Sequence, residues 1–356
     1  MKKVAILIKD ITQHSGTERA VSNLASILTA QNMEVHIISN NSFNGDKLPY
    51  ELPESVKIFH VGLPNAGIVR RAFKYVKFIY IVRKYLRANN IDILIGTGHQ
   101  YNVMMYLMGK STKKIACEHL NYEACPSLSN KVRRLIYPKL DAIVLLTSGD
   151  AANYRDFVDS RKIYIIPNSL PFISEVKSDL CTKRIIAVGR LTRQKNFEAL
   201  IEASAIIKNS CPDWHVDIFG RGEDKGKLLT LISELSLENY VRIHEPVNDI
   251  KREYLASGLI AVSSIYEGMH MGLIEAEACG LPAVSFNCNY GPSEIIHDGI
   301  DGFLVNVGDV SGLAEKIILI AQDDDLRAKM GQAAFENAKN YEPEKIAEKW
   351  RALLRA

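Results

Sequence analysis

The sequence predicts an α/β protein built from two doubly wound domains in tandem. Short apolar runs rich in β-branched residues alternate with helix-length segments along the chain, and this alternation indicates parallel sheets covered by helices. The pattern restarts after the proline- and serine-containing segment 165–179, which has the composition of a linker. A length of 356 residues also suits about two domains, and we place them at 1–170 and 171–340.

Each expected strand rests on a run of this kind. The first run, 2–8, precedes a polar loop and a helical pattern whose apolar side carries Ala20, Val21, Leu24, Ala25 and Leu28. The other expected strands are 34–39, 91–96, 113–119 and 141–147 in the first domain, and 184–191, 215–220, 259–264 and 282–286 in the second. The last segment, 341–356, has apolar residues at helical spacing after a proline, so we expect an amphipathic helix that packs back on the first domain.

Composition and charge narrow the class of protein. The chain has no run of about 18 apolar residues, so no membrane-spanning helix is expected. The six cysteines are scattered without a C-x-x-C pair and no signal-like start is present, which predicts reduced thiols in a cytoplasmic protein and no metal site. Residues 1–170 hold 23 Lys and Arg against 13 Asp and Glu, whereas residues 171–356 hold 21 against 28. The two halves therefore face different electrostatic partners.

Two loops carry candidate anion-binding groups. Gly16 stands just before the first helix, whose free N–H groups suit an anion; a flexible turn is the other interpretation. The loop lacks G-x-G-x-x-G, which argues against a dinucleotide dehydrogenase. In the second domain, Arg190 and Lys195 follow a strand that ends at Gly189. Two cations at this end of a strand suit a diphosphate, although a solvated basic loop would contain the same residues.

The segment 263–286 is the most informative part of the chain. Glu267 and Glu275 flank a turn that leads into a helix, and Gly268 and Gly272 lie between them. Glycines let a backbone approach a ligand, and a helix N-terminus offers unpaired N–H donors. Two carboxylates in this arrangement can accept hydrogen bonds from hydroxyls at opposite ends of one polyhydroxylated ligand.

The order of these motifs resembles the retaining glycosyltransferases of family four. The pattern E-G-x-x-x-x-x-x-E is followed by A-C-G-L-P-x-V, with G-R-L-x-x-x-K-N upstream and G-P-x-E-I-I-x-D-G-x-x-G downstream. The similarity extends over essentially the whole chain, including 15–19 and the pair Glu118-His119. It implies the GT-B fold, in which two Rossmann-like doubly wound domains face a central cleft. The first domain would be the acceptor side and the second would bind the nucleotide sugar.

The resemblance also implies a role for each candidate residue. Arg190 and Lys195 match the cations that hold the donor diphosphate and offset the charge of the leaving group, and Glu275 matches the carboxylate on the ribose hydroxyls. Glu267 matches the residue that contacts the donor sugar, and His119 matches the histidine beside the reacting sugar. The remaining expected donor-binding residues are Gly16 near the phosphates, Gly220 and Gly222 around the nucleotide, and Gly268, Met269, His270, Met271 and Gly272 next to Glu267.

The catalytic residues implied in this way are His119, Arg190, Lys195 and Glu267, and no metal or other cofactor is required. Preorganised cations and helix N–H groups can stabilise a departing nucleoside diphosphate by themselves. The chain departs from the family pattern at two places. His270 stands where relatives often have Pro, Ser or Gly, and it either reaches the donor sugar or points into solvent. Glu245 and Pro246 stand where a glycine is usual, which bears on the choice of nucleobase.

A basic aromatic segment favours a membrane surface. Residues 64–91 contain seven basic residues and no acid, interleaved with aromatic residues, which is typical of a helix that meets anionic lipid headgroups. The expected contact residues are Arg70, Arg71, Lys74, Lys77, Arg83 and Lys84, and the charge of the first domain is increased further by Lys131, Arg133 and Arg134. A core-packed helix with a solvated basic side is the alternative. No known nucleic-acid-binding module is present.

The sequence thus predicts a retaining, metal-independent glycosyltransferase that moves a hexose or N-acetylhexosamine from a UDP-sugar to a lipid-diphosphate-linked oligosaccharide. Its expected place is the inner face of the cytoplasmic membrane, as a peripheral protein in the synthesis of O-antigen (lipopolysaccharide), capsule or exopolysaccharide. Two alternatives stay open. One is a GT-B nucleotide-sugar epimerase, and the other is a non-catalytic protein that binds glycan or membrane on the same scaffold.

Overall fold

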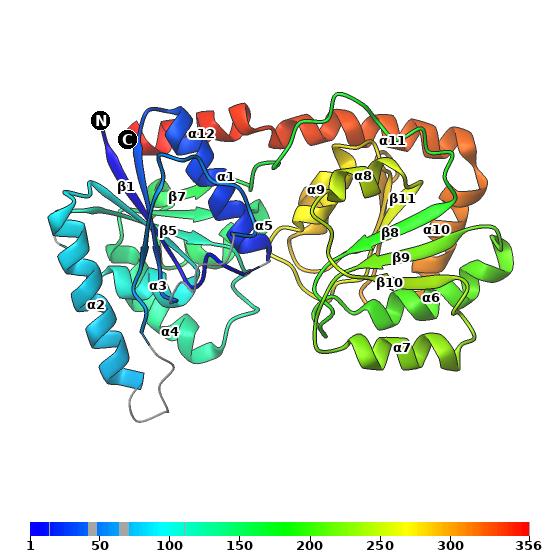
Figure 1. Ribbon diagram of the computed structural model, residues 1–356, viewed down its shortest axis with the longest axis horizontal. Helices are drawn as coiled ribbons and strands as arrows, with labels where there is room; N and C mark the ends of the chain where they lie inside the picture. Colours follow the sequence, from blue (N-terminus) through cyan, green and yellow to red (C-terminus); the bar gives the residue numbers. More distant parts are fainter. Residues whose placement is uncertain (14, 42–47, 64–70, 110, 356) are drawn as a thin grey trace. The chain divides into compact units, whose positions relative to one another are not determined.

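The chain divides into two compact units. The computed structural model describes residues 1–13, 15–41, 48–63, 71–109 and 111–355. Unit 1 comprises Met1–Pro171 together with Pro343–Ala356, and unit 2 comprises Phe172–Glu342. Each unit contains one parallel β-sheet with helices on both faces (Figure 1). The predicted α/β class with two doubly wound sheets is confirmed.

Unit 1 contains a seven-stranded parallel sheet in the order β3-β2-β1-β4-β5-β6-β7. The strands are β1 (Lys3–Ile8), β2 (Glu34–Ser39), β3 (Lys57–His60), β4 (Ile93–Thr97), β5 (Lys113–Glu118), β6 (Ala142–Leu145) and β7 (Ile163–Ile165). The helices are α1 (Gly16–Ala30), α2 (Arg71–Ala88), α3 (His99–Met105), α4 (Ser127–Ile136), α5 (Ser148–Arg155) and α12 (Pro343–Arg355), with short 3-10 turns η2 (Tyr137–Lys139) and η3 (Ser160–Lys162).

Alternate residues of the sheet in unit 1 supply two separate cores. On one face Val4, Ile6 and Ile8 of β1 pack with α1 and α12. On the other face Ala5 and Leu7 of β1 pack with α2, α3, η2 and α5. Because side chains alternate across a strand, a strand that is buried on both faces must be apolar at nearly every position. This explains the continuous apolar run at 2–8.

The C-terminal helix α12 packs on α1 in unit 1 (Figure 1). Its apolar face buries Ile346, Trp350, Leu353 and Leu354 in the core beside α1. Lysine ammonium groups satisfy carbonyls of its last turn, since Lys2 Nζ donates to Leu354 O at 2.7 Å and Lys113 Nζ donates to Leu353 O at 3.2 Å. Cations at a helix C-terminus also interact favourably with the helix dipole.

Unit 2 contains a six-stranded parallel sheet in the order β10-β9-β8-β11-β12-β13. The strands are β8 (Arg184–Val188), β9 (His215–Phe219), β10 (Val241–His244), β11 (Leu259–Val262), β12 (Ala283–Phe286) and β13 (Gly302–Val305). The helices are α6 (Phe197–Ser210), α7 (Lys225–Glu234), α8 (Ile250–Leu255), α9 (Met271–Glu277), α10 (Val310–Gln322) and α11 (Asp324–Ala338), with η4 (Pro292–Glu294) and η5 (Lys339–Tyr341).

The strand order reverses once in each sheet, between β1 and β4 in unit 1 and between β8 and β11 in unit 2. In an open parallel sheet such a reversal opens a crevice at the carboxyl ends of the two strands, where ligands bind. The loops that follow these strands are therefore the first places to look for a functional site. Four strands, β3, β7, β10 and β13, are absent from the sequence-based prediction.

Candidate functional site

The two loops at the strand reversal of unit 2 bring Lys195 and Glu267 together. Lys195 lies in the loop after β8, and Glu267 lies in the loop between β11 and α9. Lys195 Nζ donates to Glu267 Oε1 at 2.6 Å, and the two side chains keep 14% and 7% of their exposure. Both residues are expected in the donor site from their sequence motifs. The structure adds that they form one ion pair.

The electrostatics of this pair keep the carboxylate of Glu267 ionised. Burial by itself would raise the pKa of Glu267, but the positive charge of Lys195 and the hydrogen bonds from Lys195 and Ser264 outweigh burial and lower that pKa below its usual value. A buried carboxylate and a buried ammonium group each need a partner, because burial without one costs several kcal/mol. A fixed negative charge thus stands beside a fixed positive charge at the strand reversal.

His270 is buried and caps the helix that follows. Its side chain is 4% exposed, and its Nδ1 accepts a hydrogen bond from the backbone N–H of Leu273 at 3.0 Å, which makes it the N-cap of α9. Burial, with a smaller contribution from Lys195, lowers the pKa of His270 to about 4. The imidazole is therefore neutral near pH 7, and the interpretation that His270 points into solvent is wrong.

Glu275 lies inside α9 and is 1% exposed. The hydroxyl of Tyr254, in α8, lies 3.3 Å from Glu275 Oε2. Gly272 is close to the same group, because a β-carbon there would lie 3.1 Å from the Tyr254 hydroxyl. The neighbouring residues Gly268, Met269 and Met271 are also buried. Sequence analysis did not single out Tyr254, since a tyrosine in a short helix carries no signal of its own.

Arg190 differs from Lys195 in its exposure. It lies in the same loop but is exposed, and its guanidinium Nη2 donates to Gln194 Oε1 at 3.3 Å. The loop itself is tied to the segment after β11, because Ile265 N donates to Gln194 O at 2.9 Å and Ser263 Oγ donates to Lys195 O at 3.0 Å. A rigid loop with an exposed guanidinium can present that charge to an anion in solution.

Gly220 and Gly222 serve to pack the loop after β9 against the loop after β8. A β-carbon at Gly220 would lie 1.9 Å from Gly189 O, and one at Gly222 would lie 2.1 Å from Leu191 O. The two backbones are hydrogen-bonded, with Leu191 N donating to Arg221 O at 3.0 Å. These glycines thus fix the position of the loop that carries Arg190. Gly291 has a similar role, because a β-carbon at this position would lie 2.9 Å from Glu267 Cβ. This role was not predicted from the sequence.

In unit 1 the predicted residues Gly16 and His119 lie after β1 and β5. Gly16 is the first residue of α1, directly after the cap residue Ser15. His119 follows the last residue of β5, and neither of its ring nitrogens has a hydrogen-bond partner among the described residues. Burial lowers the pKa of His119 to about 4. Its side chain lines a small pocket together with Cys117, Leu24 and Trp350.

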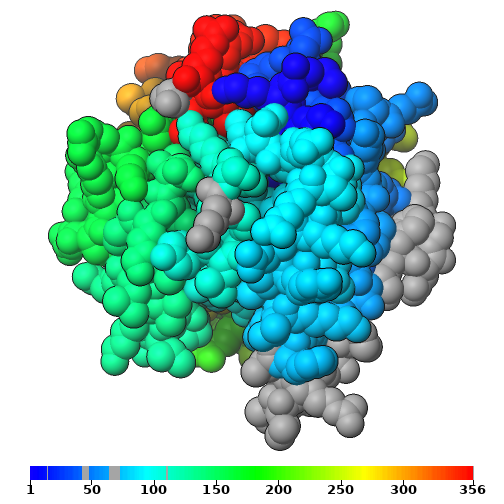
Figure 2. Space-filling view, turned by 90° about the vertical axis from the view of Figure 1, so that its left-hand side faces the viewer, coloured from blue at the N-terminus to red at the C-terminus, as the bar shows by residue number. Residues whose placement is uncertain are grey.

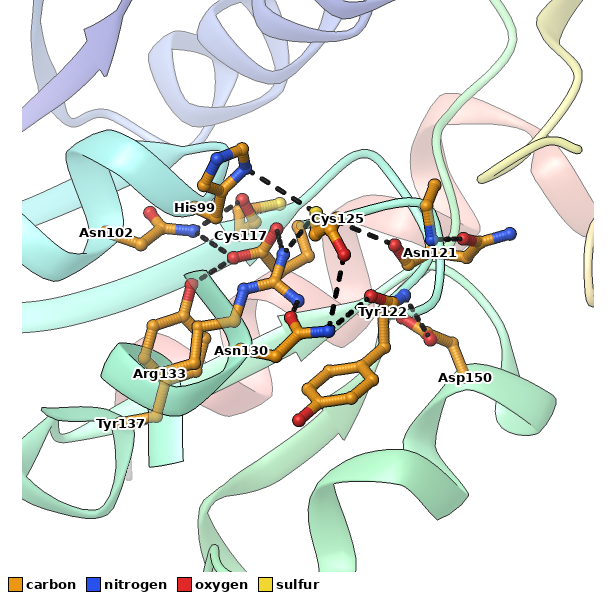
Figure 3. Close-up of polar contacts among 12 residues, drawn as sticks. His99, Asn102, Cys117, Asn121, Tyr122, Cys125, Asn130, Arg133, Tyr137 and Asp150 are labelled. Atoms are coloured by element: carbon orange, nitrogen blue, oxygen red, sulfur yellow. Dashed lines mark hydrogen bonds and ion pairs between the residues drawn. The ribbon is translucent and has the colours of Figure 1, made fainter. Parts of the chain in front are cut away.

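A buried polar cluster lies around Arg133 of α4 (Figure 3). Arg133 Nη2, from α4, lies 3.1 Å from Glu118 Oε2, and these side chains are 0% and 1% exposed. The same carboxylate accepts hydrogen bonds from Asn102 Nδ2 at 2.8 Å and from the Tyr137 hydroxyl. Burial opposes the charge on the guanidinium, but the negative charge of Glu118 outweighs it and raises the pKa of Arg133. Arg133 is thus a structural cation and adds nothing to the surface charge.

The cluster extends from Arg133 to the loop that follows His119. Arg133 Nη2 lies 3.0 Å from Cys125 Sγ, and Cys125 Sγ lies 3.6 Å from His99 Nδ1. Arg133 Nη1 donates to Asn130 Oδ1 at 3.2 Å, and Tyr122 N donates to Asp150 Oδ1 at 2.8 Å (Figure 3). The segment between β5 and α4 is therefore held by side chains from three helices. The cluster as a whole was not predicted.

The predicted membrane-contact residues fall on or next to α2. Lys77 and Lys84 are exposed, whereas Lys74 and Arg83 are half-buried. Arg70 and the side chain of Arg71 lie outside what the structure describes. Among the described residues, no helix combines the length and the apolar character that crossing a bilayer requires.

Two parallel, doubly wound sheets in one chain are the architecture of the GT-B glycosyltransferases. The chain belongs to glycosyltransferase family four. The model described as "Glycosyltransferase Family 4" matches residues 14–171, and the model described as "Glycosyl transferases group 1" matches residues 173–337. The family resemblance inferred from the motifs is thereby confirmed.

Two bacterial glycosyltransferases are similar to this chain over nearly their full length. The amylovoran biosynthesis glycosyltransferase AmsD of Erwinia amylovora is 33% identical over 367 residues, which span 99% of this chain and 100% of that protein. An α-1,4-N-acetyl-D-galactosaminyltransferase of Campylobacter jejuni, whose name specifies an undecaprenol-diphosphate-linked acceptor, is 27% identical across 99% of this chain and 98% of its own.

Solved structures share the fold. A mutant of S. aureus TarM, crystallised with UDP, α-GlcNAc-glycerol and fondaparinux, superposes with a TM-score of 0.86 at 16% identity over 100% of both chains. The Anabaena protein HepE, in complex with UDP and glucose, gives a TM-score of 0.82 at 17% identity, also over 100% of both chains. At such low identity these likenesses establish the GT-B architecture of the chain.

Proposed function

We propose that the protein transfers a hexose or an N-acetylhexosamine from a UDP-sugar to a lipid-diphosphate-linked glycan during the synthesis of a bacterial surface polysaccharide. Two observations on related proteins support the choice of substrates. HepE and TarM were crystallised with UDP, and the Campylobacter jejuni relative acts on an undecaprenol-diphosphate-linked acceptor by its name. AmsD takes part in amylovoran biosynthesis, which supports a role in polysaccharide assembly.

The observation that carries the proposal is the ion pair of Lys195 and Glu267. In the proposed reaction the bond between the anomeric carbon of the sugar and the diphosphate breaks, and UDP leaves with the electron pair. The acceptor hydroxyl forms the new bond on the same face of the sugar and gives its proton to the departing diphosphate oxygen. Lys195 and the exposed Arg190 bind the diphosphate and stabilise its growing negative charge. These two cations supply the charge that a metal ion would otherwise supply.

The remaining residues orient the donor in this proposal. Glu267 is an ionised acceptor and suits hydroxyls of the donor sugar, while Glu275 suits the ribose hydroxyls. His119 in unit 1 contacts the reacting sugar as a neutral imidazole, and Gly16 leaves the backbone at the start of α1 open to the phosphates. Each of these assignments can be tested by substitution.

We propose that the acceptor brings the enzyme to the inner face of the cytoplasmic membrane. The exposed lysines Lys77 and Lys84 of α2 would meet anionic headgroups, since each such contact is worth roughly 1 kcal/mol close to a charged bilayer. The protein would then be a peripheral one.

The first test is thermal unfolding of the full chain with UDP, GDP or ADP at matched concentrations. A ligand at about 100 times its dissociation constant stabilises a protein by roughly 2.7 kcal/mol. We expect stabilisation by UDP and little by ADP. Selective stabilisation by GDP would redirect the donor to GDP-sugars, and no response to any nucleotide would contradict a nucleotide-sugar enzyme.

The second test is transfer itself, with a panel of UDP-sugars and a lipid-diphosphate oligosaccharide, followed by mass spectrometry. Product from the donor alone would indicate an epimerase, and binding without product would indicate a non-catalytic protein. We expect the Glu275→Ala substitution chiefly to raise the KM for the donor, because Glu275 binds the ribose in both ground and transition states. Addition of EDTA is expected to leave the rate unchanged. Loss of activity in EDTA that Mg²⁺ restores would contradict the metal-independent mechanism.

A further inference from the structure

Helix α4 presents leucines to solvent in unit 1. Leu128 is 72% exposed and Leu135 is 68% exposed. The two residues are seven positions apart, so they lie on the same side of the helix two turns from each other. Lys131 lies between them on that side and is exposed, as is Arg134. Scattered single leucines on a surface are ordinary, but an aligned pair beside cations is not.

Helix α2 has a surface of the same kind on the same side of the sheet. Phe73, Val76 and Tyr80 are 75%, 65% and 67% exposed, and they recur at helical spacing. Helices α2 and α3 and the turn η2 that follows α4 contribute to a single core cluster on one face of the sheet. The side of unit 1 turned to the viewer in Figure 2 includes α2, coloured light blue to cyan. We use the name α2–α4 surface for the exposed residues of the two helices, which include Lys77, Lys84, Lys131 and Arg134.

The charge of this surface has one sign. The sequences of α2 and α4, RAFKYVKFIYIVRKYLRA and SLSNKVRRLI, contain no acidic residue. Five exposed cations of the described side chains, Lys77, Lys84, Arg87, Lys131 and Arg134, therefore lie on the same two helices as the exposed apolar side chains. A hydrophilic polyanion such as RNA would gain chiefly from the cations. A bilayer with anionic lipids gains from both, because its headgroups attract the cations and its hydrocarbon accepts the apolar side chains.

We propose that the α2–α4 surface docks on an anionic lipid bilayer and that Leu128 and Leu135 of α4 enter the acyl region. This inference rests on the proposed function for the choice of a membrane as partner, and it goes further in two ways. It adds α4, whose basic residues were predicted from the sequence only to increase the charge of the first domain. It also makes insertion of apolar side chains, rather than charge alone, the source of part of the affinity.

The test is flotation of the full-length protein with vesicles of phosphatidylcholine alone or mixed with phosphatidylglycerol. We expect binding to the mixed vesicles that partly survives high salt, because apolar contacts are not screened. The double substitution Leu128→Ser and Leu135→Ser should weaken partitioning by roughly tenfold or more. The matched control is Leu229→Ser with Leu319→Ser, two leucines of unit 2 that are 48% and 43% exposed. Equal binding of both double variants would overturn the proposal.

A second measurement reports insertion directly. The native tryptophans Trp214 and Trp350 are each 4% exposed, so the indole added by a Leu128→Trp substitution is distinguishable from them by its accessibility. We expect brominated acyl chains in the mixed vesicles to quench the added fluorescence. No quenching in bound protein, or binding that high salt abolishes and single-stranded RNA competes for, would overturn the proposal and indicate an electrostatic or nucleic-acid surface.

Failure of this inference and failure of the proposed function can be told apart. The vesicle measurements contain no sugar donor, and the transfer reaction can be run with a short-chain, soluble acceptor. We expect the Leu128→Ser and Leu135→Ser variant to transfer sugar to the soluble acceptor at the wild-type rate. A wild-type protein that binds vesicles but transfers nothing would contradict only the proposed function.

Discussion

One buried ion pair of unit 1 and one of unit 2 differ in how completely the protein encloses them. In unit 1, Arg133 and Glu118 are 0% and 1% exposed, and Tyr137, Asn102, Asn130 and Cys125 surround them with polar contacts. In unit 2, Lys195 and Glu267 keep 14% and 7% exposure. The first pair is enclosed in protein. The second lies at the strand reversal, and the loop that holds Lys195 also carries the exposed Arg190.

The difference in exposure indicates which of the two ion pairs can interact with a ligand. A buried charge that is saturated by neighbours has no capacity left for a substrate, and its loss leaves the partner charge uncompensated in a low dielectric. A pair that keeps some exposure, such as Lys195 and Glu267, can exchange part of its interaction for a new one with a ligand. We therefore expect the pair in unit 1 to control stability and the pair in unit 2 to control turnover.

The largest effect is expected for Arg133→Met. The substitution leaves the Glu118 carboxylate buried without its cation, and breaking a buried pair in this way costs about 3–5 kcal/mol. Urea unfolding followed by Trp350 fluorescence, in a Trp214→Phe background, reads unit 1 specifically because Trp350 packs in its core. Adding Glu118→Gln should recover part of the loss, since it removes the unpaired charge.

The control for this variant is Arg161→Met. Arg161 pairs with Asp159 at the surface, with 88% of its side chain exposed, and exposed pairs contribute little. If Arg133→Met and Arg161→Met unfold at the same urea concentration, the pair of Arg133 and Glu118 does not contribute to the free energy of unfolding as expected.

The Lys195→Met substitution is expected to lower turnover more than it lowers stability, in contrast to Arg133→Met. It removes a charge that we propose to stabilise the leaving diphosphate, and such a loss lowers turnover by roughly 10²–10³-fold. Its cost in stability should be smaller than that of Arg133→Met, because the open pair in unit 2 is better solvated. Lys227→Met is the matched control, since Lys227 forms an exposed ion pair with Glu198 in the same unit. An unchanged kcat for Lys195→Met would remove Lys195 from the catalytic residues.

The same contrast between enclosed and open parts explains how far the fold could be predicted. The nine strands with neighbours on both sides were all predicted, and the four that were missed, β3, β7, β10 and β13, are the four edges of the two sheets. Interior strands such as β4, in which all five residues of ILIGT are buried, form largely apolar runs. Edge strands such as β3 and β10 are only partly buried and mix charged with apolar residues, so no run distinguishes them from loops.

The polar residues described above also divide into those that a local motif predicts and those that only the fold brings together. Arg190, Lys195, Glu267 and Glu275 lie in short motifs, so their order in the chain was enough to propose them. Arg133 could not be interpreted in this way, because a basic residue in a basic helix indicates surface. Its burial depends on Glu118, Asn102 and Tyr137, which come from three other elements that only the folded sheet brings together. Networks of this kind have no local sequence signal.

A pH dependence is expected in unit 2 from His270. Its pKa in the folded state, about 4, is below the ordinary value of 6.5 because of burial, so the unfolded chain takes up a proton first as the pH falls. The stabilisation is complete above about pH 6.5 and is lost between about pH 6.5 and pH 4, with a total of about 3 kcal/mol. Urea unfolding followed by Trp214 fluorescence, in a Trp350→Phe background, measures this in unit 2.

The control for the titration is His270→Asn, which keeps an N-cap acceptor for Leu273 N–H but removes the titrating group. The free energy of unfolding should then change less between pH 6.5 and pH 4. If the variant and the wild type have the same slope over that range, the acid sensitivity of unit 2 has another origin, and His270 is not held neutral by its burial.

The smallest effects are expected at two glycines near the ends of β9 and α7. A β-carbon at Gly220 would meet the backbone oxygen of Gly189 at 1.9 Å, whereas one at Gly226 meets nothing within 4 Å. Gly220→Ala must push the loops after β8 and β9 apart, which costs about 1–3 kcal/mol and displaces Arg190. Gly226→Ala lies in the first turn of α7 and should stabilise the protein by up to about 1 kcal/mol. Thermal unfolding and titration with UDP measure both effects. Only Gly220→Ala should weaken UDP binding. Equal UDP affinities in the two variants would show that the close contact at Gly220 does not determine how Arg190 binds UDP.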